Sequence, residues 1–144
     1  KYDIVLIDVP PRLTTGTINA LCASTHVLIP TIFNPLAAEP VENFIRASKR
    51  LMDRLNPKLT FLGVVETMIP PSNQGADVRA EGRRMVAEAL QRITPTIDIL
   101  TNGVPRKSSL GEGDIGYLLP AAEGGTQIRQ IFDSLGAEIW DKLR

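Results

Sequence analysis

The sequence predicts an α/β protein in three layers, with a mostly parallel sheet between helices. Short aliphatic runs alternate with longer stretches of helical periodicity, and the chain contains no internal repeat or low-complexity segment. Strands that alternate with helices are joined by right-handed crossovers, which make neighbouring strands parallel. In addition, the first aliphatic run ends in a carboxylate followed by two prolines. That ending is typical of a strand that delivers a polar side chain to the ligand-binding edge of such a sheet.

Residues 4–9 form the first aliphatic run, in which five of six residues are aliphatic and the sixth is Asp8. Pro10 and Pro11 follow, and proline cannot continue a strand in a sheet interior. We therefore predict a buried parallel strand that carries Asp8 to the carboxyl edge of the sheet. In a nucleotide-hydrolysing fold, an aspartate at this place holds Mg²⁺ beside the phosphates, directly or through water. The alternative is a structural strand that happens to end in a polar residue.

The next elements follow from periodicity and end signals. We predict a short helix over residues 17–24, a second aliphatic strand over 26–31 and a long helix over 39–55. Pro40 suits the first turn of the long helix, and the pair Asn56-Pro57 ends it. Its apolar residues fall on one face at helical spacing; they are Val41, Phe44, Ile45, Leu51, Met52 and Leu55.

The second half continues the alternation. Residues 59–67 form a third predicted strand, and residues 97–100 a short fourth one. Asp77 can cap a helix between them, whose predicted buried face is Val78, Met85, Val86, Leu90 and Ile93. The last helix is amphipathic through Ile128, Ile131, Phe132, Leu135, Ile139 and Leu143.

The sequence contains no G-x-x-x-x-G-K-[ST] phosphate loop and no Gly-Lys pair. Its one Gly-Gly pair, Gly124-Gly125, precedes Thr126 without a preceding aliphatic strand or a lysine, which indicates a loop at a helix start. If Asp8 faces a phosphate, most of the residues that hold that phosphate therefore lie outside this sequence.

Composition sets broad limits. At 144 residues and 43% hydrophobic content, the chain can bury one core, so we expect one domain over residues 1–144. Sixteen basic and sixteen acidic residues leave no net charge, which argues against a dedicated nucleic-acid-binding protein. A single cysteine, Cys22, excludes an internal disulfide, fits a reducing compartment and is expected to be buried and inert. With no membrane-spanning apolar run and no signal-peptide pattern, we expect a soluble cytoplasmic product.

Five segments resemble, in the same order, motifs of the ParA/MinD group. These are ATPases with a deviant Walker A motif that partition plasmids and chromosomes or position cell-division machinery. Residues 8–13, 17–21 and 27–30 resemble the group's D-x-P-P-S-L segment, T-x-N-A-L helix and V-L-I-P strand. Residues 63–68 resemble its G-V-L-L-T-M strand, and residues 104–106 its I-P-R loop. The resemblance covers nearly the whole chain, as the carboxyl-terminal portion of such an ATPase domain with a P-loop NTPase-like fold that lacks its phosphate-loop portion.

The resemblance implies a site in two parts. Asp8 matches the Walker B-like aspartate, Pro10 and Pro11 a stiff switch segment that senses the γ-phosphate, and Asn19 the border of the active site. The positions that surround adenine are matched by Thr67, Met68, Val104, Pro105 and Arg106. The complete protein would then bind ATP and Mg²⁺, form a homodimer and work with a partner or adaptor protein. The phosphate-binding lysines, including the cross-dimer lysine, are absent from this chain, so we predict that it does not hydrolyse ATP alone.

Several positions depart from the family pattern. Arg12 stands where the family usually has serine, and Glu66 occupies an aliphatic strand position. The linker over residues 69–75 is longer and richer in proline than usual, and the stretch after Arg106 matches poorly. These departures indicate a specialised branch. They leave open a second hypothesis, a non-enzymatic scaffold or regulatory domain that kept the fold and lost ATP turnover.

Nonspecific DNA contact, and with it nucleoid association, is a further expectation from the resemblance. The candidate residues are Arg79, Arg83, Arg84, Arg106 and Lys107. Such contacts would be made to phosphates and would weaken steeply with salt. The alternative is a solvated helix face, because Glu81 and Glu88 interleave with the arginines. The carboxyl end, residues 137–144, is short and mixed in charge, so we expect no membrane attachment of the MinD kind.

A third hypothesis is a receiver domain, prompted by Ile7-Asp8 and by residues 113–119. It fits poorly, because a receiver needs an acidic pair upstream and a lysine after the later segment, where Pro120 stands instead. Finally, a parallel sheet that lacks its phosphate-loop strand exposes an edge or an apolar face. We therefore predict self-association or swapped pairing for this chain.

Overall fold

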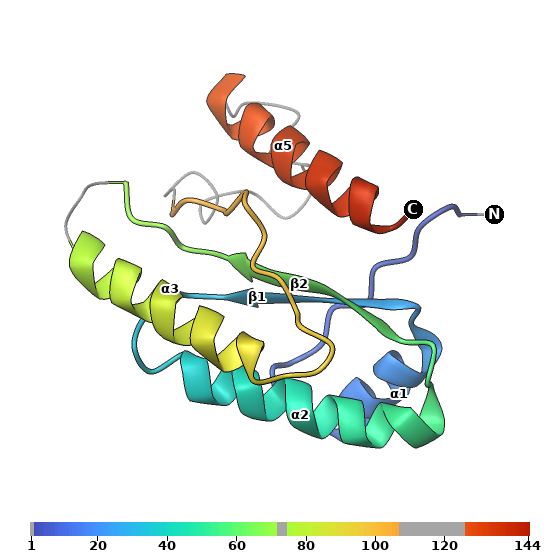
Figure 1. The fold of residues 1–144 in the computed structure, drawn as a ribbon. Coiled ribbons are helices and arrows are strands. Elements are labelled where there is room, and N and C mark those ends of the chain that lie inside the picture. Colours follow the sequence, from blue (N-terminus) through green and yellow to red (C-terminus); the bar gives the residue numbers. More distant parts are fainter. Residues whose placement is uncertain (1, 72–74, 107–125) are drawn as a thin grey trace.

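The computed structural model describes residues 2–71, 75–106 and 126–144, and the side chains of the last range from residue 129. Figure 1 shows the order of the elements along the chain. They are α1 (Thr15–Ala23), β1 (His26–Thr31), α2 (Ala38–Leu55), β2 (Thr60–Glu66), α3 (Ala76–Gln91) and α5 (Thr126–Lys142). The predicted long helix, second strand and third strand are thus confirmed to within one residue at each end.

The sheet is parallel. β1 pairs with β2 from His26↔Thr60 to Thr31↔Glu66, with one irregularity between Val27 and Leu28. A third segment lies on the other side of β2, where Ile99 forms an isolated parallel bridge with Val64. Backbone hydrogen bonds flank this bridge, because Val64 N donates to Asp98 O at 2.9 Å and Leu100 N donates to Val64 O at 2.8 Å. The α/β class and the parallel sheet are therefore confirmed, whereas residues 97–100 form a bridge rather than the full strand that we predicted.

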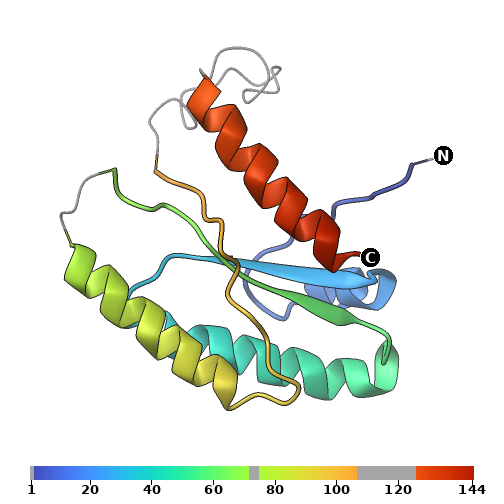
Figure 2. The same cartoon turned by 45° about the horizontal axis from the view of Figure 1, so that its top comes forward.

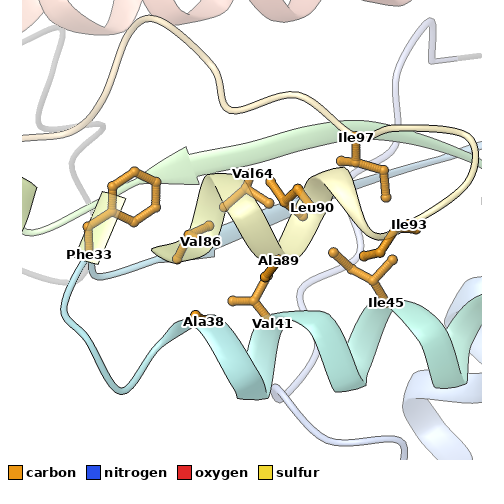
Figure 3. Packing of buried hydrophobic residues seen from close by; sticks show 10 residues of the cluster. All are labelled: Phe33, Ala38, Val41, Ile45, Val64, Val86, Ala89, Leu90, Ile93 and Ile97. Atoms are coloured by element: carbon orange, nitrogen blue, oxygen red, sulfur yellow. The ribbon is translucent and has the colours of Figure 1, made fainter. Parts of the chain in front are cut away.

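Helices cover both faces of the sheet. In Figures 1 and 2, α2 and α3 lie on one face and α5 lies on the other. Neighbouring β2 residues point to opposite faces, as the pleat requires. Val64 joins the core toward α2 and α3, and Val65 packs with Leu100 and Leu135 on the α5 side. This arrangement confirms the three layers. The larger core, drawn in Figure 3, consists of Phe33, Ala38, Val41, Ile45, Val64, Val86, Ala89, Leu90, Ile93 and Ile97.

Asn56 ends α2 and also fastens it to α1. Its backbone N–H donates to Met52 O at 2.9 Å, which closes the last turn of the helix. Its side-chain amide donates to Leu21 O at 2.9 Å and to Ser24 O at 2.8 Å, at the end of α1. These carbonyls have no partner within their own helix, so one asparagine satisfies both helix ends.

Two glycines allow the close packing around β2 and α3. Gly63 has a φ of 148°, and a Cβ there would lie 2.8 Å from Asp98 O. Gly82 on α3 faces the backbone of Asn34, and a Cβ there would lie 2.5 Å from Asn34 N. A side chain at either position would force the neighbouring backbone to move, which explains why the contacts use glycine.

The predicted first strand is wrong. Residues 2–14 form neither helix nor strand, and Figure 1 draws the segment as an extended trace (dark blue). Leu6 is 92% exposed and Val5 is 73% exposed. The aliphatic pattern predicts a strand from local sequence, but a strand also needs a neighbouring backbone. Within the described residues, neither β1 nor β2 pairs with this segment.

Three smaller expectations also need correction. α3 starts at Ala76 after Gly75, whose φ is 77°, and no side chain caps it, so Asp77 lies in the first turn rather than at the cap. Val78 is 55% exposed and does not belong to the buried face of α3. Cys22 is exposed rather than buried, whereas its neighbour Leu21 is buried.

Candidate functional site

A hydrogen-bonded turn follows Asp8. Pro10 O accepts from Arg12 N at 2.8 Å and from the Thr17 hydroxyl at 3.4 Å. Thr17 is fully buried, and its N–H donates to the side chain of Thr14, the N-cap of α1, at 3.3 Å. The turn therefore ties the Pro10 carbonyl to the first turn of α1.

The predicted phosphate-side residues lie at or near this turn and face solvent. Asp8, Pro10 and Pro11 are exposed in the segment before α1, and Asn19 is exposed on α1 itself. No group of three or more His, Cys, Asp or Glu side chains in the described part of the chain is arranged to hold a metal. One carboxylate is still a suitable contribution to a Mg²⁺ site, because Mg²⁺ keeps several waters and binds through one or two carboxylates plus substrate phosphates.

The predicted adenine-side residues come from two distant segments that pair with each other. Val104 N donates to Glu66 O at 2.8 Å, Ile69 N to Val104 O at 3.1 Å and Arg106 N to Ile69 O at 2.7 Å. Ile69 and Pro105 form an isolated parallel bridge. We call residues 67–69 and 104–106 together the paired loops. They bring Thr67, Met68, Val104, Pro105 and Arg106 side by side.

The paired loops extend the sheet at its carboxyl edge. Thr67 N donates to Thr31 O at 2.8 Å, and the Thr67 hydroxyl donates to the same oxygen at 3.2 Å. Thr31 is the last residue of β1, so the loops start where β1 and β2 end. Ligands in open α/β sheets bind at this edge. Hydrogen bonds of the described residues do not join Asp8 or Asn19 to the paired loops, so the structure shows the two halves of the predicted site separately.

Met68 has an unusual backbone. Its φ is 57°, the left-handed region that a non-glycine residue seldom adopts, and it is 48% exposed. Such backbone strain costs about 1–3 kcal/mol and clusters at ligand sites. The strained residue thus lies in the segment that the sequence pattern assigned to the adenine side.

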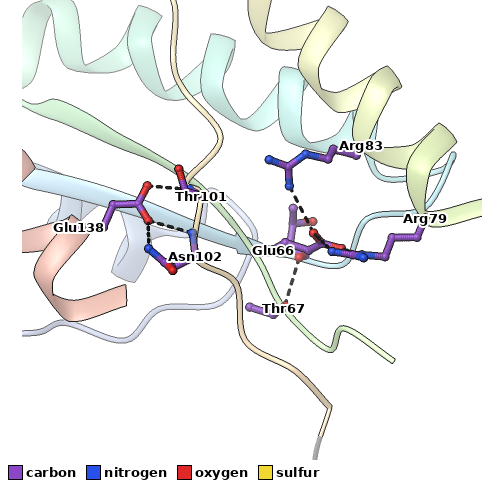
Figure 4. Close-up of polar contacts among 8 residues, drawn as sticks. Glu66, Thr67, Arg79, Arg83, Thr101, Asn102 and Glu138 are labelled. Atoms are coloured by element: carbon purple, nitrogen blue, oxygen red, sulfur yellow. Dashed lines mark hydrogen bonds and ion pairs between the residues drawn. The ribbon is translucent and has the colours of Figure 1, made fainter. Parts of the chain in front are cut away.

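Glu66 is a buried carboxylate at the end of β2 that sequence reasoning noticed but did not explain. It is 3% exposed and pairs with two arginines of α3 (Figure 4). Arg79 binds both carboxylate oxygens, with Nη2 at 2.9 Å from Oε2, and Arg83 Nη1 lies 3.4 Å from Oε2. The hydrogen bonds that Arg79 donates to the Glu66 carboxylate raise the pKa of Arg79. A carboxylate in an aliphatic strand, followed by two arginines four residues apart on the next helix, was the signal for this cluster.

Glu138 on α5 is a second carboxylate that the sequence did not single out. Its oxygens accept from Thr101 N at 2.7 Å, Asn102 N at 2.9 Å and Asn102 Nδ2 at 2.8 Å (Figure 4). Burial acts to raise the pKa of Glu138, but the combined donation from Thr101 and Asn102 outweighs it and lowers that pKa. Nothing local in the sequence marks this contact, because its partners lie 36 and 37 residues away.

The candidate DNA contacts on α3 are already paired within the protein. Arg79 and Arg83 bind Glu66, and Arg84 binds Glu81 at 2.7 Å as well as Glu88. Lys107 lies outside the described residues, as do Gly124-Gly125 and residues 113–119 of the receiver hypothesis. These ion pairs favour the solvated helix face, and DNA contact stays a prediction.

Comparison with known proteins finds similarity to partitioning ATPases. A family model described as "AAA domain" matches residues 1–61. The chain is 28% identical over 146 residues to the chromosome-partitioning ATPase Soj of Thermus thermophilus, covering 96% of this chain and 54% of that protein. It is 36% identical over 94 residues to the chromosome partitioning protein ParA of Caulobacter vibrioides, covering 62% of this chain and 35% of that protein.

A further match is an uncharacterized protein of Pseudomonas putida, 43% identical over 71 residues, which covers 49% of this chain and 27% of that protein. The chain therefore spans about half or less of the length of the curated relatives it matches, from 27% to 54% for these three. In the described residues, every helix is too short or too polar to cross a membrane.

Proposed function

We propose, on the premise that this chain belongs to the ParA/MinD-type family of P-loop ATPases, that it supplies the adenine side and the metal carboxylate of an ATP site. In the full-length protein, ATP binding and hydrolysis would be coupled to dimerisation and to partitioning or positioning of a plasmid, a chromosome or other cargo. An adaptor protein would link the ATPase to that cargo.

The pairing of the two loops supports this proposal most strongly. Two segments matched independently to adenine-side motifs lie in hydrogen-bond contact at the carboxyl edge of the sheet. Pro105 has no amide proton and a rigid ring, so a purine can lie flat against it. Thr67 is held to β1 through Thr31, which would keep this side of the site in place.

The phosphate side would be served by the turn after Asp8. The exposed carboxylate of Asp8 is free to face a metal, and Pro10 and Pro11 limit the conformations of the segment beside it. Mg²⁺ bound there would gather negative charge from the phosphates. Asn19, one turn further into α1, would border this side of the site. The chain contains no lysine in a phosphate loop, so we expect no ATP hydrolysis by these 144 residues alone.

A non-enzymatic scaffold or regulatory domain is the second candidate. Two observations favour it: Arg12 replaces the family's serine beside the prolines, and the Glu66 cluster adds a structural ion pair where the family has an aliphatic residue. Such a protein would keep the three-layer fold and its partner contacts without ATP turnover.

Magnesium-dependent ATP affinity of the full-length protein separates the two candidates. The affinity of ATP would be measured by calorimetry with Mg²⁺ and with a chelator, for the wild type and for Asp8→Asn. Asp3→Asn is the matched control, because Asp3 is an exposed aspartate of the same extended segment. We expect Asp8→Asn to lose the Mg²⁺ dependence and Asp3→Asn to keep it. A wild-type protein that does not bind ATP would support the scaffold instead.

A further inference from the structure

The carboxylate of Glu138 binds the backbone just before the second paired loop. It accepts the N–H groups of Thr101 and Asn102 and the side-chain amide of Asn102, all within 2.7–2.9 Å. Hydrogen bonds to an ionised carboxylate are about twice as strong as neutral ones. Asn102 Nδ2 also lies 3.4 Å from Ser134 O, one turn earlier on α5. Two turns of α5 therefore contact this one residue.

The chain between Asn102 and the paired loops is closely packed against β2 and Ile69. Gly103 follows Asn102, and a Cβ on it would lie 2.7 Å from Ile69 Cδ1 and 2.8 Å from Glu66 O. The next residue, Val104, donates its N–H to that same Glu66 oxygen. A displacement of Asn102 must therefore pass to Val104, Pro105 and Arg106 rather than be absorbed by a flexible linker.

Polar contacts and apolar packing both join α5 to the segment that holds Asn102 and the second paired loop. A hollow of about 240 Å³ lies between them, lined by Asn102, Gly103, Gln130, Ile131 and Ser134. The apolar residues Leu135 and Ile139 of α5 belong to a cluster with Val65 and Leu100 in the sheet and Val104 in the second paired loop. Glu138 lies between these two residues in sequence and is the carboxylate that reaches the loop.

We propose that Glu138 is a positioning residue for the adenine side of the ATP site and that α5 responds to adenine binding through it. The inference rests on the proposed function, because it assigns the paired loops to the base. Glu138 itself does not contact the nucleotide. It sets the position of Thr101 and Asn102, and through Gly103 the position of the residues that would contact adenine.

The test uses Glu138→Gln in the full-length protein. Glutamine keeps the length of the side chain but removes the charge and presents an NH₂ group to backbone N–H donors. Asp141→Asn is the matched control, because Asp141 is an exposed carboxylate one turn further along the same helix. Affinity would be measured for Mg-ATP and for magnesium tripolyphosphate, which has no base. We expect Glu138→Gln to weaken ATP binding by about tenfold and to leave tripolyphosphate binding unchanged. Asp141→Asn should bind both ligands like the wild type.

Amide hydrogen exchange gives a second readout that general destabilisation would not reproduce. In the wild type, ATP should slow exchange in residues 101–106 and also in α5 around Glu138. In Glu138→Gln, the slowing in α5 should be lost while residues 67–69 remain protected. If Glu138→Gln does not fold, Asn102→Ala removes one of the three donors, and we expect about threefold weaker ATP binding.

The outcomes are distinguishable. Glu138→Gln that binds ATP like the wild type would overturn the inference and leave the proposed function intact. Equal weakening of ATP and tripolyphosphate would also overturn it, because the effect would then not involve the base. Wild-type protein that binds no ATP would reject the proposed function, and the inference with it.

Discussion

Glu66 and Arg79 form a bidentate ion pair across the carboxyl end of β2, with the carboxylate buried and the guanidinium partly exposed. The pair joins the last residue of β2 to the first turn of α3. The backbone carbonyl oxygen of Glu66 also accepts a hydrogen bond from Val104 N, in the second paired loop. Glu66 thus connects three elements that meet at the candidate site.

Removing the Glu66 charge should destabilise the fold. In Glu66→Gln, the buried side chain loses its ionic partners, whereas Arg79 and Arg83 stay partly solvated, at 41% and 44% side-chain exposure. The loss of stability is therefore smaller than for a fully buried ion pair. We expect a decrease of about 1–3 kcal/mol in the free energy of unfolding. Urea denaturation measures it. Glu39→Gln, an exposed glutamate on α2, should change stability by about 0.5 kcal/mol or less. Equal losses for both variants would contradict this account.

The same substitution should increase nonspecific DNA binding. Arg79 and Arg83 are occupied by Glu66 in the folded protein, and Glu66→Gln releases them for phosphates. We expect the slope of log affinity against log salt to steepen by about one to two. Fluorescence anisotropy with a labelled duplex at several salt concentrations measures it, with Glu39→Gln as the variant of equal net charge. If the two variants bind DNA alike, the arginines of α3 are not DNA contacts.

How far the sequence predicted this structure depends on how local each signal is. The helix α2 and the strand β1 follow from periodicity within the segment itself, so their bounds were predicted almost to the residue. The strand over residues 4–9 had an equally clear pattern, but strand formation also depends on a neighbouring backbone that no local pattern contains.

The site shows the same division. The family resemblance assigned Thr67, Met68 and residues 104–106 to the surroundings of adenine. The structure pairs these two segments, and their contact with adenine stays a prediction. Glu66 was recognised as a departure, yet its function in the fold depends on Arg79, thirteen residues later on another element. The contact of Glu138 could not be predicted from the sequence, because it is made to backbone amides, which nearly any residue supplies.

The stability contribution of Glu138 should depend on pH. Its folded-state pKa is depressed, so the contribution is fully present above the unfolded pKa of about 4.3. It is lost as pH falls through the folded value, because the protonated acid accepts the backbone N–H groups more weakly. We expect the difference in unfolding free energy between wild type and Glu138→Gln to be constant from pH 7 to 5 and to shrink below pH 4. A difference that is the same at all pH values would contradict the ionised carboxylate contact.

The exposed apolar segment should make this chain self-associate. Tyr2, Val5 and Leu6 are 88%, 73% and 92% exposed, in a segment that pairs with neither strand of the described sheet. Such segments pair with other chains. Sedimentation of the 144-residue chain should show a concentration-dependent increase in mass, and Leu6→Lys should reduce it. A clean monomer at high concentration would count against this prediction.

Photo-crosslinking with 8-azido-ATP tests the central claim most directly, because the azide is on the base. The full-length protein would be labelled with and without excess ATP, digested, and the adducts mapped by mass spectrometry. We expect adducts within residues 67–69 and 104–106 that excess ATP abolishes. Adducts confined to other residues, or labelling that ATP does not compete, would contradict the assignment of the paired loops to adenine.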